Sequence, residues 1–155
     1  MEPEKVLAFS AASGRIAYVY FERSRLRDLS LSSTASASPK NAAKFARRHI
    51  IRLNPDVVIT EKIAKRSRKG AHTRALVQAM AREAASHEVL DVSIARVQHH
   101  ANKYAEAESL AKRFPELKSV LPKPRRIWEK EPPAITYFEA AALALEVFSN
   151  KSPRP

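Results

Sequence analysis

The segment Asp56-Val57-Val58-Ile59-Thr60 decides the fold class of this chain, because its apolar residues follow one another without alternation. A strand with one face in water alternates apolar and polar residues, whereas a continuous apolar run is typical of a strand covered on both faces. Asn54-Pro55, directly before the run, ends a preceding helix. We therefore expect a central strand in a sheet that carries helices on both faces.

Three further strands are predicted before this segment. Residues 5–10 form a short apolar run, and residues 15–21 are rich in β-branched and aromatic side chains. Residues 25–31 alternate more loosely, as an edge strand does. The short connections between these strands predict an antiparallel meander.

Helical spacing dominates the rest of the chain. Ser38-Pro39 is an N-cap followed by Pro at the first helical position, which predicts a helix that ends at Asn54-Pro55. Further helices are predicted over 73–87, 101–113 and 136–148, the last capped by Thr136, with a fifth strand over 88–97 and an irregular segment over 114–133. The predicted fold class is α/β, a five-stranded mixed sheet of three antiparallel and then two parallel strands, flanked by helices.

Length and composition predict one domain. The chain has 155 residues, of which 45% are hydrophobic, and this is enough for a core over residues 1–149 with a disordered tail at 150–155. The absence of Cys excludes disulfides, thiolate metal sites and cysteine nucleophiles. No apolar stretch is long enough for a membrane span, and the first residues do not resemble a secretory signal. We expect an intracellular, cytoplasmic protein without a membrane partner, nucleoid-associated if it binds DNA.

The charge predicts an anionic partner. Lys and Arg number 28 against 16 Asp and Glu, a net charge of +12. Each phosphate that a cation neutralises releases counterions, so nucleic acid is the expected ligand. The alternative is a basic surface that aids solubility and binds nothing in particular.

Two basic stretches are candidates for nucleic-acid contact. Residues 62–69 hold five cations and end at Gly70, which favours a phosphate-binding loop over a solvated charge run. The five are Lys62, Lys65, Arg66, Arg68 and Lys69. Arg125 and Arg126 form the second stretch, followed by Trp128, whose indole either stacks on an unpaired base or anchors the irregular segment.

Two carboxylates and a serine are candidates for a catalytic site. Ser10 ends the first predicted strand, Glu61 the fourth, and Glu139 opens the last helix. Strand ends in α/β sheets border the ligand crevice, where two carboxylates would hold Mg²⁺ or Mn²⁺ for phosphodiester hydrolysis. The alternatives are an exposed Glu61 at a strand end and a Glu139 that forms a capping box with Thr136.

Three histidines need an interpretation. His99 and His100 follow the fifth predicted strand, where either one replaces a missing carboxylate as metal ligand or acid–base group, or both are exposed to solvent. His49 falls on the helix face with Ala42 and Phe45 and is predicted to be structural.

Three short motifs resemble those of the RuvC-type Holliday junction resolvases, in the ribonuclease H-like superfamily. Residues 6–13, VLAFSAAS, resemble the family's opening strand I-L-G-I-D-P-G-S. Residues 54–61, NPDVVITE, resemble K-P-D-x-V-x-I-E, and residues 138–144, FEAAALA, resemble the closing helix D-A-A-D-A-L-A. The order of elements agrees over residues 5–148.

The resemblance implies a ribonuclease H-like fold, a homodimer, and a Mg²⁺- or Mn²⁺-dependent endonuclease that acts on branched DNA. Glu61 stands where the family has its Glu, but Ser10 stands at the position of the first Asp, the metal-bridging ligand. The acidic positions of the closing helix fall on Phe138 and Ala141, so Glu139 is one place out of register.

Three functions stay open. The first is a divergent endonuclease that uses Glu61 and Glu139, with Ser10 at the metal edge. The second is a catalytically inactive nuclease fold that binds nucleic acid or a protein partner. The third is a structural protein that binds RNA without specificity.

Overall fold

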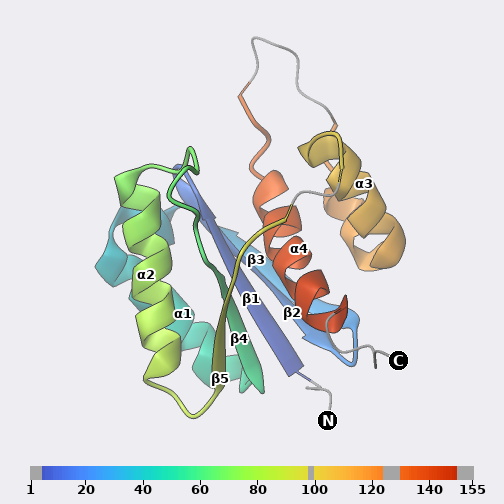
Figure 1. Cartoon of the computed structure of the whole chain (residues 1–155). Coiled ribbons are helices and arrows are strands. Elements are labelled where there is room, and N and C mark those ends of the chain that lie inside the picture. Colours follow the sequence, from blue (N-terminus) through green and yellow to red (C-terminus); the bar gives the residue numbers. More distant parts are fainter. Residues whose placement is uncertain (1–4, 98–99, 124–129, 150–155) are drawn as a thin grey trace.

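A five-stranded sheet runs through the middle of the computed structural model, which describes residues 5–97, 100–123 and 130–149 (Figure 1). The strands are β1 (Lys5–Ala12), β2 (Arg15–Glu22), β3 (Arg25–Ser32), β4 (Val57–Glu61) and β5 (Leu90–Ile94). Their order is β3-β2-β1-β4-β5. β1 pairs antiparallel with β2, which pairs antiparallel with β3, whereas β4 runs parallel to β1 and β5 parallel to β4. The predicted mixed sheet is confirmed.

Helices cover both faces of the sheet. They are α1 (Pro39–Leu53), α2 (Ala71–Ala85), α3 (Lys103–Arg113) and α4 (Ile135–Ser149), with short 3₁₀ helices at Thr34–Ala37 and Pro115–Val120. α1 and α2 lie on one face, α3 and α4 on the other (Figure 1). Alternate residues of β1 therefore enter two cores: Leu7 and Phe9 pack toward α1 and α2, Val6 and Ala8 toward α3 and α4.

The apolar run that predicted β4 is buried, and the Ser38-Pro39 pair that predicted α1 begins that helix. Val57, Val58 and Ile59 are at most 3% exposed, because β4 lies between two strands and two helical layers. Ser38 accepts a hydrogen bond of 3.1 Å from the Asn41 amide and caps α1. α1 ends at Leu53, and its C-cap Asn54 has a φ of 48°, in the left-handed region that Asn tolerates.

The structure corrects two local predictions. Thr136 does not cap the last helix, because α4 begins at Ile135 and the Thr136 hydroxyl accepts a hydrogen bond of 2.6 Å from Arg15 Nε instead. The segment after α3 is not irregular throughout, since Pro115–Val120 is a 3₁₀ helix with Leu117 fully buried in the core. The predicted tail at 150–155 lies outside the described residues.

His49 is a core residue, as predicted. Its ring lies 4.5 Å from that of Tyr18 and 4.7 Å from that of Phe45, measured between centroids. Burial, together with the nearby charges of Arg52 and Arg48, lowers the pKa of His49 to about 4. The imidazole is therefore neutral at physiological pH.

No membrane-spanning helix is found in the described part of the chain, since none of its helices is long and apolar enough to cross a membrane.

Candidate functional site

Ser10 and Glu61 lie on neighbouring parallel strands and on the same face of the sheet. Glu61 ends β4 as predicted, whereas β1 continues past Ser10 to Ala12, because Ala11 and Ala12 still pair with β2. Ala8 on β1 pairs with Ile59 on β4, and two residues further along each strand are Ser10 and Glu61. Ala8 and Ile59 both face α3 and α4, so the alternation of a strand turns Ser10 and Glu61 to that face as well. Ser10 is fully buried, and its Oγ has no hydrogen-bond partner among the described residues.

Glu139 lies at the same end of the sheet, near the start of α4. Its side chain is 5% exposed, and its Oε2 is 3.8 Å from Lys69 Nζ and 3.9 Å from Arg96 Nη1. Because α4 begins at Ile135 and the carboxylate faces these two cations, the capping-box alternative is wrong for Glu139.

Lys69 connects the two predicted carboxylates. Its ammonium donates a hydrogen bond of 2.7 Å to Glu61 Oε1 and another of 3.0 Å to the backbone oxygen of Ala11. The side chains of Lys69 and Glu61 are 18% and 8% exposed, so this ion pair lies largely out of water. Lys69 was predicted as a nucleic-acid contact with its four neighbours, but its charge is directed inward.

Arg96 and Glu106 form a second ion pair next to Glu139. Arg96, which follows β5, donates from Nη2 to Glu106 Oε1 on α3, and its Nη1 faces Glu139. Burial raises the pKa of Glu106, although Arg96 opposes the shift. We call Glu61, Glu106 and Glu139 the carboxylate cluster. The two cations lie between these carboxylates, so negative and positive charges alternate in the order Glu61, Lys69, Glu139, Arg96, Glu106.

The loop between β4 and α2 carries the remaining basic candidates. Lys62, Lys65, Arg66 and Arg68 are exposed. Arg74 on α2 holds the loop from behind, with hydrogen bonds from its guanidinium to the backbone oxygens of Ala64 at 2.9 Å, Ser67 at 3.2 Å and Lys69 at 3.0 Å. A hollow of about 200 Å³ beside the loop is lined in part by Glu61, Lys62 and Arg74. The four exposed cations, which we call the basic loop, thus stand on a fixed backbone.

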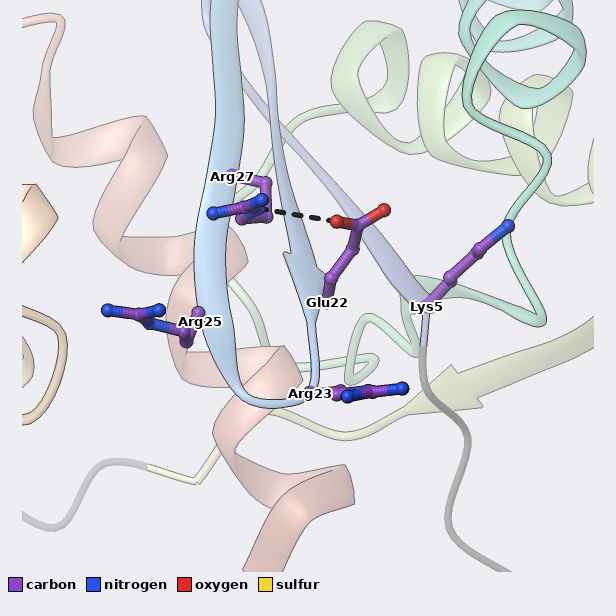
Figure 2. A pocket seen from close by; sticks show the side chains of 5 residues that line it. All are labelled: Lys5, Glu22, Arg23, Arg25 and Arg27. Carbon is purple, nitrogen blue, oxygen red and sulfur yellow. Dashed lines mark hydrogen bonds and ion pairs between the residues drawn. The ribbon is translucent and has the colours of Figure 1, made fainter.

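A cationic pocket lies at the opposite end of the sheet. It has a volume of about 340 Å³ and is lined by Lys5, Glu22, Arg23, Arg25 and Arg27. Figure 2 shows these side chains around the start of β1 and the turn between β2 and β3, with Arg27 Nε bonded to Glu22 Oε1 at 3.2 Å. Four cations against one carboxylate make this pocket a second candidate for anion contact.

Four residues that were predicted as candidates for the site lie outside the described residues: Arg125, Arg126, Trp128 and His99.

The residues present do not suit a resident Mg²⁺ or Mn²⁺. Hard cations bind several carboxylate oxygens together, and no group of three or more His, Asp or Glu in the described ranges is arranged to hold a metal ion. Ser10 supplies a neutral hydroxyl beside Glu61, and the Lys69 ammonium lies between Glu61 and Glu139. A divalent ion would have to displace that ammonium, so we derive no step through a metal.

Arg96, Glu106 and Arg74 were not predicted from the sequence. Arg96 could have been predicted as a site residue, because it follows the fifth strand at the same end of the sheet as Glu61. Glu106 lies four residues before Leu110, on the apolar side of α3, where a carboxylate needs a partner. Nothing in the sequence marks Arg74, since its partners are backbone oxygens.

Solved structures of Holliday junction resolvases share this fold. Thermus thermophilus RuvC, in a structure with a Holliday junction substrate, matches with a TM-score of 0.67 at 14% identity, over 94% of this chain and 94% of that chain. Fowlpox virus resolvase, in complex with substrate Holliday junction DNA, matches with a TM-score of 0.63 at 14% identity, over 96% and 99%. No protein-family model matches the chain, and no curated protein matches it in sequence. The fold is ribonuclease H-like, as the motif resemblance implied.

Proposed function

We propose that this protein binds DNA through the basic loop, with branched DNA such as a four-way junction as the preferred form. The observation that carries the proposal is the basic loop itself, four exposed cations on a backbone that Arg74 fixes beside the carboxylate cluster. Cations held in place lose less entropy on binding a phosphate than cations on a mobile chain. The fold supports branched DNA as the ligand, since the two resolvases above were solved with Holliday junctions.

Binding without cleavage is the form of this function that the cluster supports. Metal-dependent hydrolysis needs carboxylates free to coordinate cations that activate water and clamp the scissile phosphate. Lys69 and Arg96 already engage Glu61, Glu139 and Glu106. The catalytically inactive alternative is therefore preferred over the divergent endonuclease.

The cationic pocket supplies a second contact in this proposal. It lies five residues along β1 from Ser10, a separation of about 17 Å at the rise of a strand, or about five base pairs of duplex. Phosphates at both places would belong to one DNA molecule. We further propose a single domain over residues 1–149 that acts as a homodimer, which sedimentation with and without junction DNA tests.

The experiment compares binding to a labelled four-way junction with binding to a duplex of matched sequence, by gel shift and fluorescence anisotropy. Each is titrated in EDTA, in Mg²⁺ and in Mn²⁺, over a range of salt. We expect tighter binding to the junction, retained in EDTA, with no new cleavage product. Changing Lys65, Arg66 and Arg68 together to Gln should lower the slope of log K against log salt by about 2 to 3.

The matched control changes three exposed cations elsewhere, Arg82, Lys112 and Lys118, to Gln. Equal losses in the two triple variants would mean that net charge alone drives binding, and the basic loop would lose its role. Equal affinity for junction and duplex would favour the structural protein without specificity. Nicking in Mn²⁺ that Glu61→Ala abolishes would instead establish the endonuclease.

A further inference from the structure

The three glutamates of the carboxylate cluster are largely buried, and cationic side chains of the protein itself lie against them. Glu61, Glu106 and Glu139 come from β4, α3 and α4, and their side chains are only 8%, 6% and 5% exposed. A carboxylate removed from water is costly unless a cation or several hydrogen-bond donors compensate it. The fold therefore needs positive charge at this position.

The two cations lie between the carboxylates rather than beside them. Lys69 reaches Glu61 at 2.7 Å and Glu139 at 3.8 Å, while Arg96 bonds to Glu106 and reaches Glu139 at 3.9 Å. Glu139 is thus shared by both cations, as a bridging carboxylate is shared by two metal ions. An ammonium has three donors, and two of those of Lys69 are used by Glu61 and the Ala11 backbone oxygen.

We propose that Lys69 and Arg96 are built-in cations that take the place of a pair of divalent metal ions, Lys69 between Glu61 and Glu139, and Arg96 between Glu139 and Glu106. Two tethered single charges offset two of the three carboxylates at all times. The cluster then does not depend on the metal content of the solution, and Arg74 keeps Lys69 in place by its bond to the Lys69 backbone oxygen. This inference does not rest on DNA binding.

Removal of Lys69 should expose a set of oxygen donors suited to a hard cation. Glu61, Glu139, the Ala11 backbone oxygen and the unpartnered, fully buried Ser10 Oγ are all at this end of the sheet. Carboxylate, carbonyl and hydroxyl oxygens are ligands for Mg²⁺ and Mn²⁺. A Lys69→Ala variant should therefore gain a response to metal that the natural chain lacks.

The test is thermal unfolding of the whole chain in EDTA and in millimolar MnCl₂, together with Mn²⁺ binding followed by electron paramagnetic resonance. We expect the same Tm for the natural chain in both solutions, and no bound Mn²⁺. Lys69→Ala should lower the Tm in EDTA by roughly 10 °C, because it leaves buried carboxylates unpaired. MnCl₂ should restore much of this loss, and the variant should bind about one Mn²⁺.

Two control variants distinguish the loss of the Lys69 ammonium within the cluster from a general loss of positive charge. Lys65→Ala removes an exposed cation of the same loop and should change neither the Tm nor the metal response. The double variant Glu61→Gln, Lys69→Ala should lose the Mn²⁺ response, since one of the two carboxylates is gone.

Two outcomes would overturn the proposal. The first is stoichiometric Mn²⁺ binding by the natural chain that Glu61→Gln abolishes, a measurement that needs no folded Lys69 variant. The second is a Lys69→Ala variant as stable as Lys65→Ala and equally indifferent to Mn²⁺. Neither result concerns DNA affinity, so failure here and failure of the DNA-binding proposal are distinguishable.

Discussion

Arg74 Nε donates a hydrogen bond to the backbone oxygen of Lys69 at a distance of 3.0 Å. Helix α2 thereby fixes the end of the loop from which the Lys69 side chain enters the carboxylate cluster. The same guanidinium bonds to the backbone oxygens of Ala64 and Ser67. A guanidinium presents its donors in a rigid fork, so α2 adds to the loop's own hydrogen bonds, from the Ser67 amide to the Ala64 oxygen and from the Lys69 amide to Ser67 Oγ.

Arg74→Gln should loosen the loop without unfolding the protein. Loss of several hydrogen bonds, each worth about 1 kcal/mol, should raise the population of the open loop roughly tenfold or more. Limited trypsin digestion measures this as faster cleavage after Lys65, Arg66 or Arg68. Arg82→Gln, an exposed change on the same helix, is the control. Equal cleavage rates in the two variants would contradict the role of Arg74.

The sheet and its helices were predictable because their signals are local. The continuous run Val57-Val58-Ile59 requires cover on both faces, and Ser38-Pro39 can begin a helix wherever the chain carries it. Both signals consist of adjacent residues, so neither requires knowledge of which distant side chains meet. The order of the strands followed from the resemblance to a known fold as much as from periodicity.

The site was predictable only in part, because its chemistry depends on which side chains meet. Ser10, Glu61 and Glu139 were named from strand ends and a helix start, and the structure brings them to one end of the sheet. The sequence does not distinguish Lys69 from Arg68, since both belong to one basic run. Lys69 turns inward because Glu61, Glu139 and the Ala11 backbone oxygen meet at this end of the sheet.

His49 should make the stability of the protein fall between neutral and mildly acidic pH. Its folded-state pKa is about 4, below the ordinary 6.5, so the unfolded chain takes up the proton first as the pH falls. Stability from this group is present above pH 6.5 and is lost as the pH falls toward 4. Urea unfolding should show about 2 kcal/mol less stability at pH 5 than at pH 7 from His49 alone.

The check on this prediction is the difference between the natural chain and His49→Gln. Asp28 is the carboxyl group nearby, and its pKa is lowered from 3.8, so it titrates below this pH window. The pKa values of Tyr18 and Arg52 are raised, so these groups titrate above it. A His49→Gln variant whose stability falls by the same amount between pH 7 and pH 5 would show that another group is responsible.

Ser24→Gly should stabilise the turn between β2 and β3. Arg23 and Ser24 have φ values of 52° and 66°, the left-handed region that a two-residue hairpin turn requires and that Gly adopts without strain. The preceding hairpin already has Gly14 at such a position, with φ 79°. We expect Ser24→Gly to raise the free energy of unfolding by about 1 kcal/mol, measured by urea denaturation. Ser30→Gly, within β3, should lower it, and a loss of stability at both sites would contradict the strain at Ser24.

The cationic pocket should contribute to DNA affinity independently of the basic loop. Lys5 and Arg25 line it, and neutralising both to Gln removes up to two phosphate contacts. The slope of log K against log salt should then fall by about 1 to 2. Because the pocket and the loop lie at opposite ends of the sheet, the losses should add when the two sets of changes are combined.

The matched control for this pair is Lys112→Gln with Lys118→Gln, which removes the same charge from an exposed part of α3 and the 3₁₀ helix after it. Fluorescence anisotropy on the four-way junction compares the two double variants in EDTA. A pocket variant that binds as tightly as the control would mean that DNA does not reach this end of the sheet. Additive losses would mean that DNA contacts both ends of the sheet, because a ligand confined to the basic loop would feel charges at the opposite end only through weak, screened attraction.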